Sequence, residues 1–190
     1  MRAQLIAGVR AVVVFTVLLG VAYPLAVTAV AQIGMGDAAD GSLIRRDGKV
    51  LGSRLMGQSF DGDQWFQPRP SSAGEGYDAM ASSASNLGPT NPEFLATITD
   101  RVDVYRSGNG LDAATPVPVD AVTGSGSGLD PDSSVANARL QAPRVAQARG
   151  IEVSRILALV DDHTEGKLLG FVGEPRVNVV ELNIAVSELG

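Results

Sequence analysis

Residues 11–36 read AVVVFTVLLGVAYPLAVTAVAQIGMG and contain no charged side chain. At about 1.5 Å of rise per residue, a helix of this length crosses the ~30 Å hydrocarbon core of a bilayer. Leucine, valine, phenylalanine and alanine dominate from Val12 to Val30, so the run is apolar on all sides. The sequence therefore predicts a short leading segment, residues 1–10, a transmembrane helix over residues 11–36, and one domain over residues 37–190. Within the helix, Thr16 and Gly20 are spaced so that another helix can approach closely.

A cleavable export signal is the alternative interpretation of the same run. Arg2 and Arg10 form a basic amino end, and Ala29 to Ala31 form the small-x-small pattern that precedes signal-peptidase sites. The uncharged run is longer than the ~7–15 residue apolar core of a signal, and it continues through Ile33. We therefore expect a retained anchor in contact with the lipid bilayer. The alternative is an exported soluble binding protein released after Ala31.

The charges that flank the span favour one orientation in the cell membrane. Arg10 immediately precedes the span, whereas Asp37 and Asp40 follow it before any basic residue. Basic residues next to a span favour the cytoplasmic side, although a basic cluster at 45–49 makes the count ambiguous. We expect a cytoplasmic amino terminus and an extracytoplasmic domain.

Composition limits what the domain can be. The chain has 190 residues, a net charge of −6, one histidine and no cysteine. About 150 residues remain behind the anchor, which is enough for one domain with its own core. Without cysteine there are no disulfides or thiolate metal sites, and with His163 alone we predict no metal site. The acidic balance argues against nucleic acid as a partner.

Periodicity behind the anchor predicts a mixed α+β domain. Glycine, proline, serine and asparagine are dense between residues 67 and 92, which predicts a long loop. A helix should begin at Pro92, capped by Thr90 or Asn91, with an apolar stripe in the core. The other predicted elements are short strands between Gly41 and Phe66, a helix over Pro131–Ala142 that Pro143 interrupts and Arg144–Arg149 resumes, a helix over Ile151–His163, and strands over Leu168–Val172 and Val177–Val186.

A glycine-rich stretch, TGSGSGLDP at residues 123–131, is the strongest motif for binding chemistry. Glycine-rich backbone in front of a helix can present free N–H groups to an anion or nucleotide. The stretch lacks the Lys-Ser/Thr ending of a P-loop and the glycine spacing of a dinucleotide site, and no Gly-x-Ser-x-Gly elbow is present. The alternative is a turn whose Asp130 caps the next helix.

Several segments, taken in order, resemble one family: the C chain (KdpC) of the Kdp-type potassium-transporting P-type ATPase of bacteria. Together with the anchor they cover nearly the whole chain, and five motifs in order are specific where each alone is weak. One departure is Ala84, where the family usually has glycine in a Ser-Ser-Gly-Ser run. The matching residues are Arg69-Pro70-Ser71 with Gly74-x-Gly76-Tyr77-Asp78, Ser85 to Pro92, Val122-Thr123 with Ser125 to Asp130, Arg144-Val145-Ala146 with Ala148-Arg149-Gly150, and Gly173 to Val179 with Leu182-Asn183.

The resemblance implies a non-catalytic accessory subunit of a potassium transport complex. Its partners would be a potassium-conducting chain and a P-type chain that hydrolyses ATP. The resemblance also implies a catalytic chaperone that raises the ATP affinity of the pump chain, with nucleotide binding of its own. If the domain binds ATP, the candidate residues are Gly124, Ser125, Gly126, Ser127 and Gly128 together with Gln141, whose amide can pair with adenine or ribose. We predict no catalytic residues.

The implied chaperone role conflicts with the expected topology. A domain outside the cell cannot touch ATP inside it, so any effect on ATP affinity would be indirect coupling from the potassium-entry side. On that side, the loop over residues 67–92 is the expected docking segment for the potassium-conducting chain, because it is long and carries aromatic and hydrogen-bonding groups.

Overall fold

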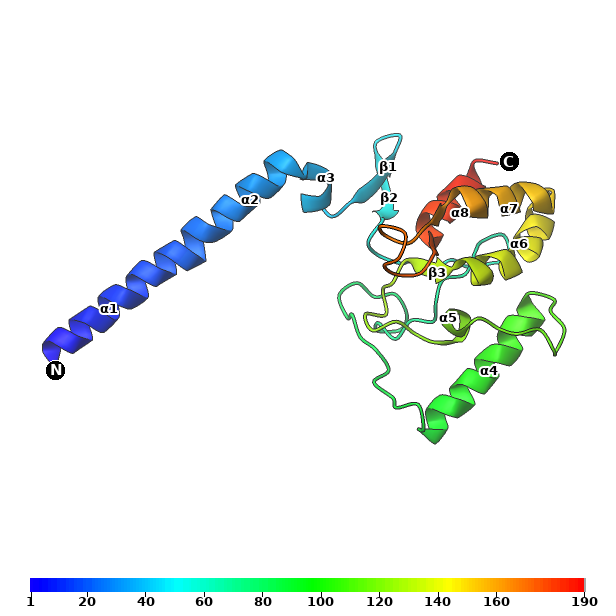
Figure 1. Cartoon of the computed structure of the whole chain (residues 1–190), viewed down its shortest axis with the longest axis horizontal. Helices are drawn as coiled ribbons and strands as arrows, with labels where there is room; N and C mark the ends of the chain where they lie inside the picture. Colours follow the sequence, from blue (N-terminus) through cyan, green and yellow to red (C-terminus); the bar gives the residue numbers. More distant parts are fainter. Residues whose placement is uncertain (190) are drawn as a thin grey trace. The chain divides into compact units, whose positions relative to one another are not determined.

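The computed structural model describes residues 1–189, which form two compact units, Met1–Val50 and a second that begins at Leu51 (Figure 1). In the first unit a 33-residue helix, Arg2–Gly34, is long and apolar enough to cross a membrane, and none of its residues is buried. It begins nine positions before the predicted residue 11 and ends two before residue 36. The early start follows from residues such as arginine, alanine and glutamine, which favour helix as well as leucine does.

A widened turn divides this helix. It consists of α1 Arg2–Val17, the π-helical turn η1 Leu18–Ala22 and α2 Tyr23–Gly34. In a regular α-helix the ring of Pro24 would meet the carbonyl of Gly20, four residues earlier. Gly20 lies inside η1, so the wider turn accommodates the proline without ending the helix.

A short helix, α3 Gly36–Ala39, and a hairpin of β1 Leu43–Arg46 and β2 Lys49–Ser53 follow. The hairpin turn uses Asp47 at φ 48° and Gly48 at φ 75°. Two positive φ values in a two-residue connection match the right-handed twist of paired strands. The turn of this hairpin therefore consists of Asp47 and Gly48.

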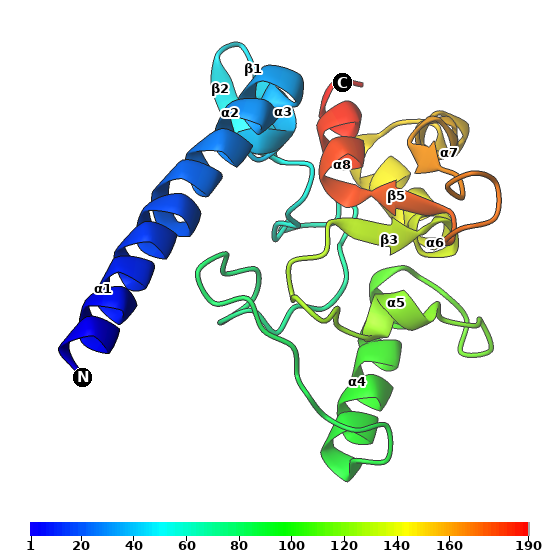
Figure 2. The ribbon, with the colours of Figure 1, turned by 60° about the vertical axis from the view of Figure 1, so that its left-hand side comes forward.

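The second unit combines helices with a small antiparallel sheet, which confirms the predicted single helix followed by an α+β domain. Its sheet has the order β3-β5-β4, with Ser133 and Thr164 each paired to Val177. Helices α6, α7 and α8 lie beside this sheet (Figure 2). The elements are α4 Pro92–Gly108, α5 Val119–Val122, β3 Asp132–Ser134, α6 Val135–Arg149, α7 Val153–Asp162, β4 Thr164–Glu165, β5 Arg176–Asn178 and α8 Val179–Ser187.

The core of this unit lies where α6, α7 and α8 meet β5. Phe66 from the loop before α4 is 1% exposed and is among the largest buried side chains. Burying such side chains stabilises the fold by about 1.5–3 kcal/mol each. The other members are Ala138, Ala142, Val145, Ala146, Ile156, Val160, Val177, Val179, Leu182 and Val186.

The predicted strand over Val177–Val186 is wrong beyond Asn178, because α8 occupies most of it. Apolar residues do alternate there, but the buried positions Val179, Leu182, Asn183 and Val186 follow the helical spacing of three and four. Asn178 caps this helix, since its side chain accepts hydrogen bonds from the backbone N–H groups at residues 180 and 181. The helix therefore begins directly after Asn178.

Two predictions about α6 are also wrong. The helix begins at Val135 and not Pro131, and its cap is Ser134, whose side chain accepts from the N–H of Asn137. Asp130 instead accepts from the N–H of Asp132. Pro143 does not interrupt the helix, because its neighbours Ala142, Val145 and Ala146 are held in the core and outweigh one missing backbone bond.

The predictions for the long loop and for helix α4 agree with the structure only in part. Residues 67–91 contain no helix or strand in the described chain, and the last residue of the predicted loop, Pro92, begins α4. Helix α4 begins at Pro92 as predicted, and Asn91 accepts hydrogen bonds from the N–H groups of Glu93 and Phe94. Its apolar stripe is only half-buried, not in the core, because α4 lies at the side of the unit.

Candidate functional site

The glycine-rich stretch is a buttressed turn packed on the long loop. The Ser71 hydroxyl donates to the Gly128 carbonyl at 2.6 Å, and the N–H of Ser83 donates to the Ser127 carbonyl at 3.0 Å. Arg69 donates from Nη2 to the Gly124 carbonyl at 3.2 Å. The glycine- and serine-rich composition of both segments therefore serves one contact, in which the loop holds the turn in shape.

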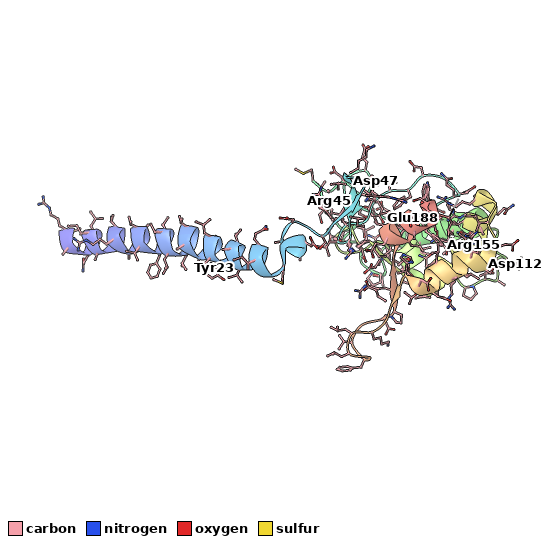
Figure 3. All side chains as sticks on the ribbon, turned by 90° about the horizontal axis from the view of Figure 1, so that it is seen from above. Tyr23, Arg45, Asp47, Asp112, Arg155 and Glu188 are labelled. Atoms are coloured by element: carbon pink, nitrogen blue, oxygen red, sulfur yellow. The ribbon has the colours of Figure 1, made fainter. Side chains whose placement is uncertain are left out.

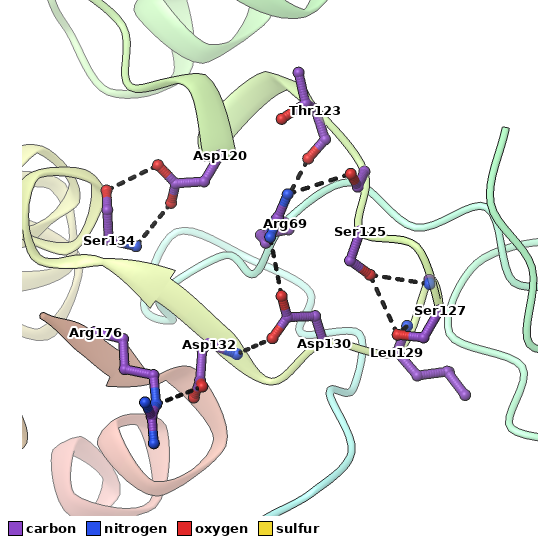
Figure 4. A network of polar contacts seen from close by, with 12 residues as sticks. Arg69, Asp120, Thr123, Ser125, Ser127, Leu129, Asp130, Asp132, Ser134 and Arg176 are labelled. Carbon is purple, nitrogen blue, oxygen red and sulfur yellow. Dashed lines mark hydrogen bonds and ion pairs between the residues drawn. The ribbon is translucent and has the colours of Figure 1, made fainter. Parts of the chain in front are cut away.

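Two backbone donors of this turn are bonded within the turn itself. The N–H of Gly128 donates to Ser125 Oγ at 2.9 Å, and that of Leu129 donates to Ser127 Oγ at 3.1 Å (Figure 4). An anion cradle needs such N–H groups to point at the ligand. These two are already bonded to serine hydroxyl groups, so binding an anion there would first break both contacts.

Gly128 is required by geometry at this place. Its φ is 68°, and a Cβ built on it would lie 2.6 Å from the Ser83 carbonyl oxygen and 2.7 Å from the Ala73 nitrogen. Both neighbours are backbone atoms that a side-chain rotation cannot move. The glycine thus permits close packing of two chain segments.

An ion pair fixes the end of the turn. Arg69 Nη1 lies 2.9 Å from Asp130 Oδ2, and Arg69 Nε donates to the Thr123 carbonyl (Figure 4). The Tyr77 hydroxyl donates to the Arg69 carbonyl. Burial of Tyr77 raises the pKa of its hydroxyl, and Asp130 raises it further while Arg69 opposes. This hydroxyl therefore stays protonated and acts as a donor.

Gln141 is bonded on every side by the protein. Its Oε1 accepts from the N–H of Gln67 at 2.7 Å and from Arg144 Nη2 at 2.8 Å. Its Nε2 donates to the Gln67 carbonyl at 3.1 Å and to Asn137 Oδ1 at 2.8 Å. A side-chain amide has two donors and room for two acceptor contacts, so all four positions are filled. The side chain is 1% exposed.

Asn183 binds the backbone of Phe66 in the same way that Gln141 binds the backbone of Gln67. Its Oδ1 accepts from the N–H of Phe66 at 2.8 Å and its Nδ2 donates to the Phe66 carbonyl at 2.9 Å. Two buried amides, from α8 and α6, therefore replace the strand partners that the backbone of residues 66 and 67 lacks. Sequence reasoning missed both roles; the available signal was a lone polar residue within an apolar helical pattern.

A second polar network links α5, α6 and α4. Asp120 accepts from the Ser134 hydroxyl at 2.8 Å and from the Ser134 N–H (Figure 4). It also accepts from Asn137 Nδ2. The Tyr105 hydroxyl donates to Asn137 Oδ1 at 2.8 Å. Burial raises the pKa of the Tyr105 hydroxyl, with a further contribution from Asp120 against Arg144. Tyr105 therefore ties the partly exposed α4 to the core.

A cleft of about 420 Å³ lies beside Gln141 in this unit. Its walls include Phe60, Arg101, Tyr105, Gln141 and Arg144. Arg144 donates hydrogen bonds to the carbonyls of residues 63 and 65, to the side chain of Asn109 and to Gln141. Burial lowers the pKa of the Arg144 guanidinium. The structure does not bring the predicted nucleotide residues together, because Gln141 lines this cleft and residues 124–128 do not.

Comparison with known proteins gives one consistent result. The family model described as "KdpC: K+-transporting ATPase, c chain" matches residues 5–188. A Mycobacterium bovis (strain BCG / Pasteur 1173P2) protein named potassium-transporting ATPase KdpC subunit is 58% identical over 189 residues, which is 100% of both chains. A protein of the same name from Caulobacter vibrioides is 56% identical over 90% of this chain and 86% of its own length. One from Kineococcus radiotolerans is 51% identical over 94% of this chain and 90% of its own length.

Proposed function

Because this chain belongs to the KdpC family, the C chains of K⁺-transporting ATPases, we propose that it is the accessory subunit of an ATP-driven potassium uptake complex. The observation that supports this proposal most directly is the length over which the sequences are identical. Identity of 58% extends over the full length of both chains, so it includes the apolar helix as well as the domain. The partners are then a potassium-conducting chain and a P-type chain that hydrolyses ATP.

The helix acts as a retained anchor in the cell membrane. Its 33 residues exceed what a signal core needs, and the family match runs from residue 5 through the whole helix. Arg10 in front of the span and Asp37 behind it favour a cytoplasmic amino terminus and an extracytoplasmic domain. This proposal replaces release of a soluble binding protein after Ala31.

The subunit is non-catalytic and acts as a catalytic chaperone that raises ATP affinity in the pump chain through indirect coupling. The internal bonds of the domain support the indirect route. Direct recognition of ATP by Gln141 would give up four protein contacts, each worth about 0.5–1.5 kcal/mol net. Coupling between distant sites needs no nucleotide in this domain, because a change in either site alters the other by the same free energy.

Loss of the chain tests the proposal in cells. A strain that lacks only this chain should fail to grow where potassium is too scarce for other uptake systems, because the remaining chains form an incomplete complex. The full chain supplied from a plasmid should restore growth and rubidium uptake, and added potassium should rescue both strains. Equal uptake with and without the chain would refute its role as a required subunit.

A further inference from the structure

Tyr23 places a polar hydroxyl group near the middle of the apolar helix. The residue lies at the start of α2, 13 positions after Arg10 and 14 positions before Asp37, which are the nearest charged residues on either side. Its side chain is 63% exposed and is labelled on the long helix in Figure 3. Tyrosine in membrane helices gathers at the two water interfaces, where its hydroxyl meets headgroups and water. Tyr23 departs from this pattern.

The depth of Tyr23 in a bilayer follows from the two flanking charges. Arg10 and Asp37 both stay outside the hydrocarbon core, and at ~1.5 Å per residue they stand about 40 Å apart along the helix. The core is ~30 Å thick, so the helix can slide through it by about 10 Å at most. In every such placement the Tyr23 backbone stays about 9 Å or more inside the nearer boundary. The hydroxyl therefore lies in hydrocarbon.

The helix supplies no partner for this hydroxyl. Tyr23 makes no side-chain hydrogen bond within residues 1–50, all of which the structure describes. Hydrocarbon offers no acceptor, so an unpaired hydroxyl there bears the full cost of leaving water. Pro24 adds a second deficit, because it brings no N–H and leaves the carbonyls of the preceding turn one donor short. Neighbouring helices commonly satisfy such groups inside a bilayer.

The surface around Tyr23 suits a neighbouring helix. A hollow of about 320 Å³ lies against this side of the helix, and two of its lining residues are alanines. Small residues let a second helix approach closely enough for a hydrogen bond between the two helices. Spacings of three and four positions keep most of the lining residues on one face. They are Tyr23, Ala26, Val27, Val30, Ala31 and Met35.

We propose that the Tyr23 hydroxyl donates a hydrogen bond, inside the hydrocarbon core, to a side-chain oxygen on a transmembrane helix of another chain. This rests on the proposed function, which places the chain in a membrane complex. The helix that occupies the hollow carries a hydroxyl or amide side chain at mid-bilayer depth. Lipid does not replace it, because acyl chains carry no acceptor. A second copy of this chain does not either, because two tyrosine hydroxyls sharing one hydrogen bond leave one proton unpaired.

Tyr23→Phe removes the hydroxyl and keeps the aromatic ring, so the helix and the hollow are preserved. When wild-type and variant chains are expressed together, mass spectrometry of the purified complex gives the ratio in which they are incorporated, relative to their amounts in carbonate-washed membranes. We expect the wild-type chain to be favoured about threefold to tenfold, as befits one hydrogen bond between membrane helices.

Thr28→Val is the matched control. It removes a hydroxyl from the same helix at a position that does not line the hollow. A threonine hydroxyl can bond to the backbone carbonyl four residues earlier, so it needs no partner helix. The Thr28→Val chain should therefore be incorporated as well as the wild-type chain.

Photocrosslinking in the assembled complex identifies the occupant. A photoreactive benzoylphenylalanine in place of Tyr23 should give an adduct with another chain of the complex. Adducts with a second copy of this chain or with lipid alone, or equal incorporation of the Tyr23→Phe chain, would overturn the contact and leave the subunit role intact. If the wild-type chain copurifies with no potassium-transport chain, the proposed function fails, and the contact fails with it.

Discussion

Replacing Gly128 by alanine is expected to lower the free energy of unfolding of the domain by about 3 kcal/mol. Two costs add: the φ of 68° at this position disfavours any side chain by about 1 kcal/mol, and the new methyl group overlaps backbone atoms of Ser83 and Ala73, which costs about 2 kcal/mol. Urea titration of the full chain in detergent, followed by the fluorescence of Trp65, measures the loss.

The same stretch supplies its own control. A Cβ at Gly126 meets nothing within 4 Å, and the φ of this glycine is not positive, so Gly126→Ala should change stability by less than about 0.5 kcal/mol. Equal stability of the Gly128 and Gly126 variants would show that the turn is not buttressed by the loop. A nucleotide cradle would then regain support.

Replacing Gln141 by methionine is expected to cost about 3 kcal/mol, although the two side chains have similar length. The substitution leaves the N–H and carbonyl of Gln67 and one donor of Arg144 without this partner in a part-buried region. Each such group costs about 1–3 kcal/mol when water does not replace the contact. Thermal unfolding should show a lower melting temperature and an earlier exposure of Trp65.

Gln147→Met is the matched control, because Gln147 lies on the exposed side of the same helix. It should change stability by less than about 0.5 kcal/mol. If Gln141→Met kept full stability but reduced activation of the complex by ATP, Gln141 would be a ligand-binding residue and its hydrogen bonds to the loop would be incidental.

Local signals predicted the elements well wherever a cap or a long apolar run decided them. A long apolar helix over residues 11–36, α4 behind Asn91 and a loop before α4 were visible in the sequence, although the helix begins earlier, at Arg2. The segment after Asn178 was misassigned because alternating and helical patterns overlap in a short apolar run. Only its tertiary neighbours, α6 and α7, show which residues are buried.

The candidate site was harder to predict, because glycine has two uses that look alike in sequence. It can free backbone N–H groups for a ligand, or it can let two backbones pack closely. Gly128 does the second, and the residue that requires it, Ser83, lies 45 positions away. Gln141 likewise meets a partner at Gln67, 74 positions earlier, which no local pattern reveals.

Surface labelling in intact cells tests the extracytoplasmic location of the domain, on which indirect coupling to ATP depends. Asp112 is exposed and labelled in Figure 3, and the chain has no cysteine, so Asp112→Cys offers a unique thiol. Asn109 is less suitable, since it bonds to Arg144. The thiol should react with a membrane-impermeant reagent before lysis. Reaction only after lysis would place the domain in the cytoplasm, where direct contact with ATP becomes the better explanation.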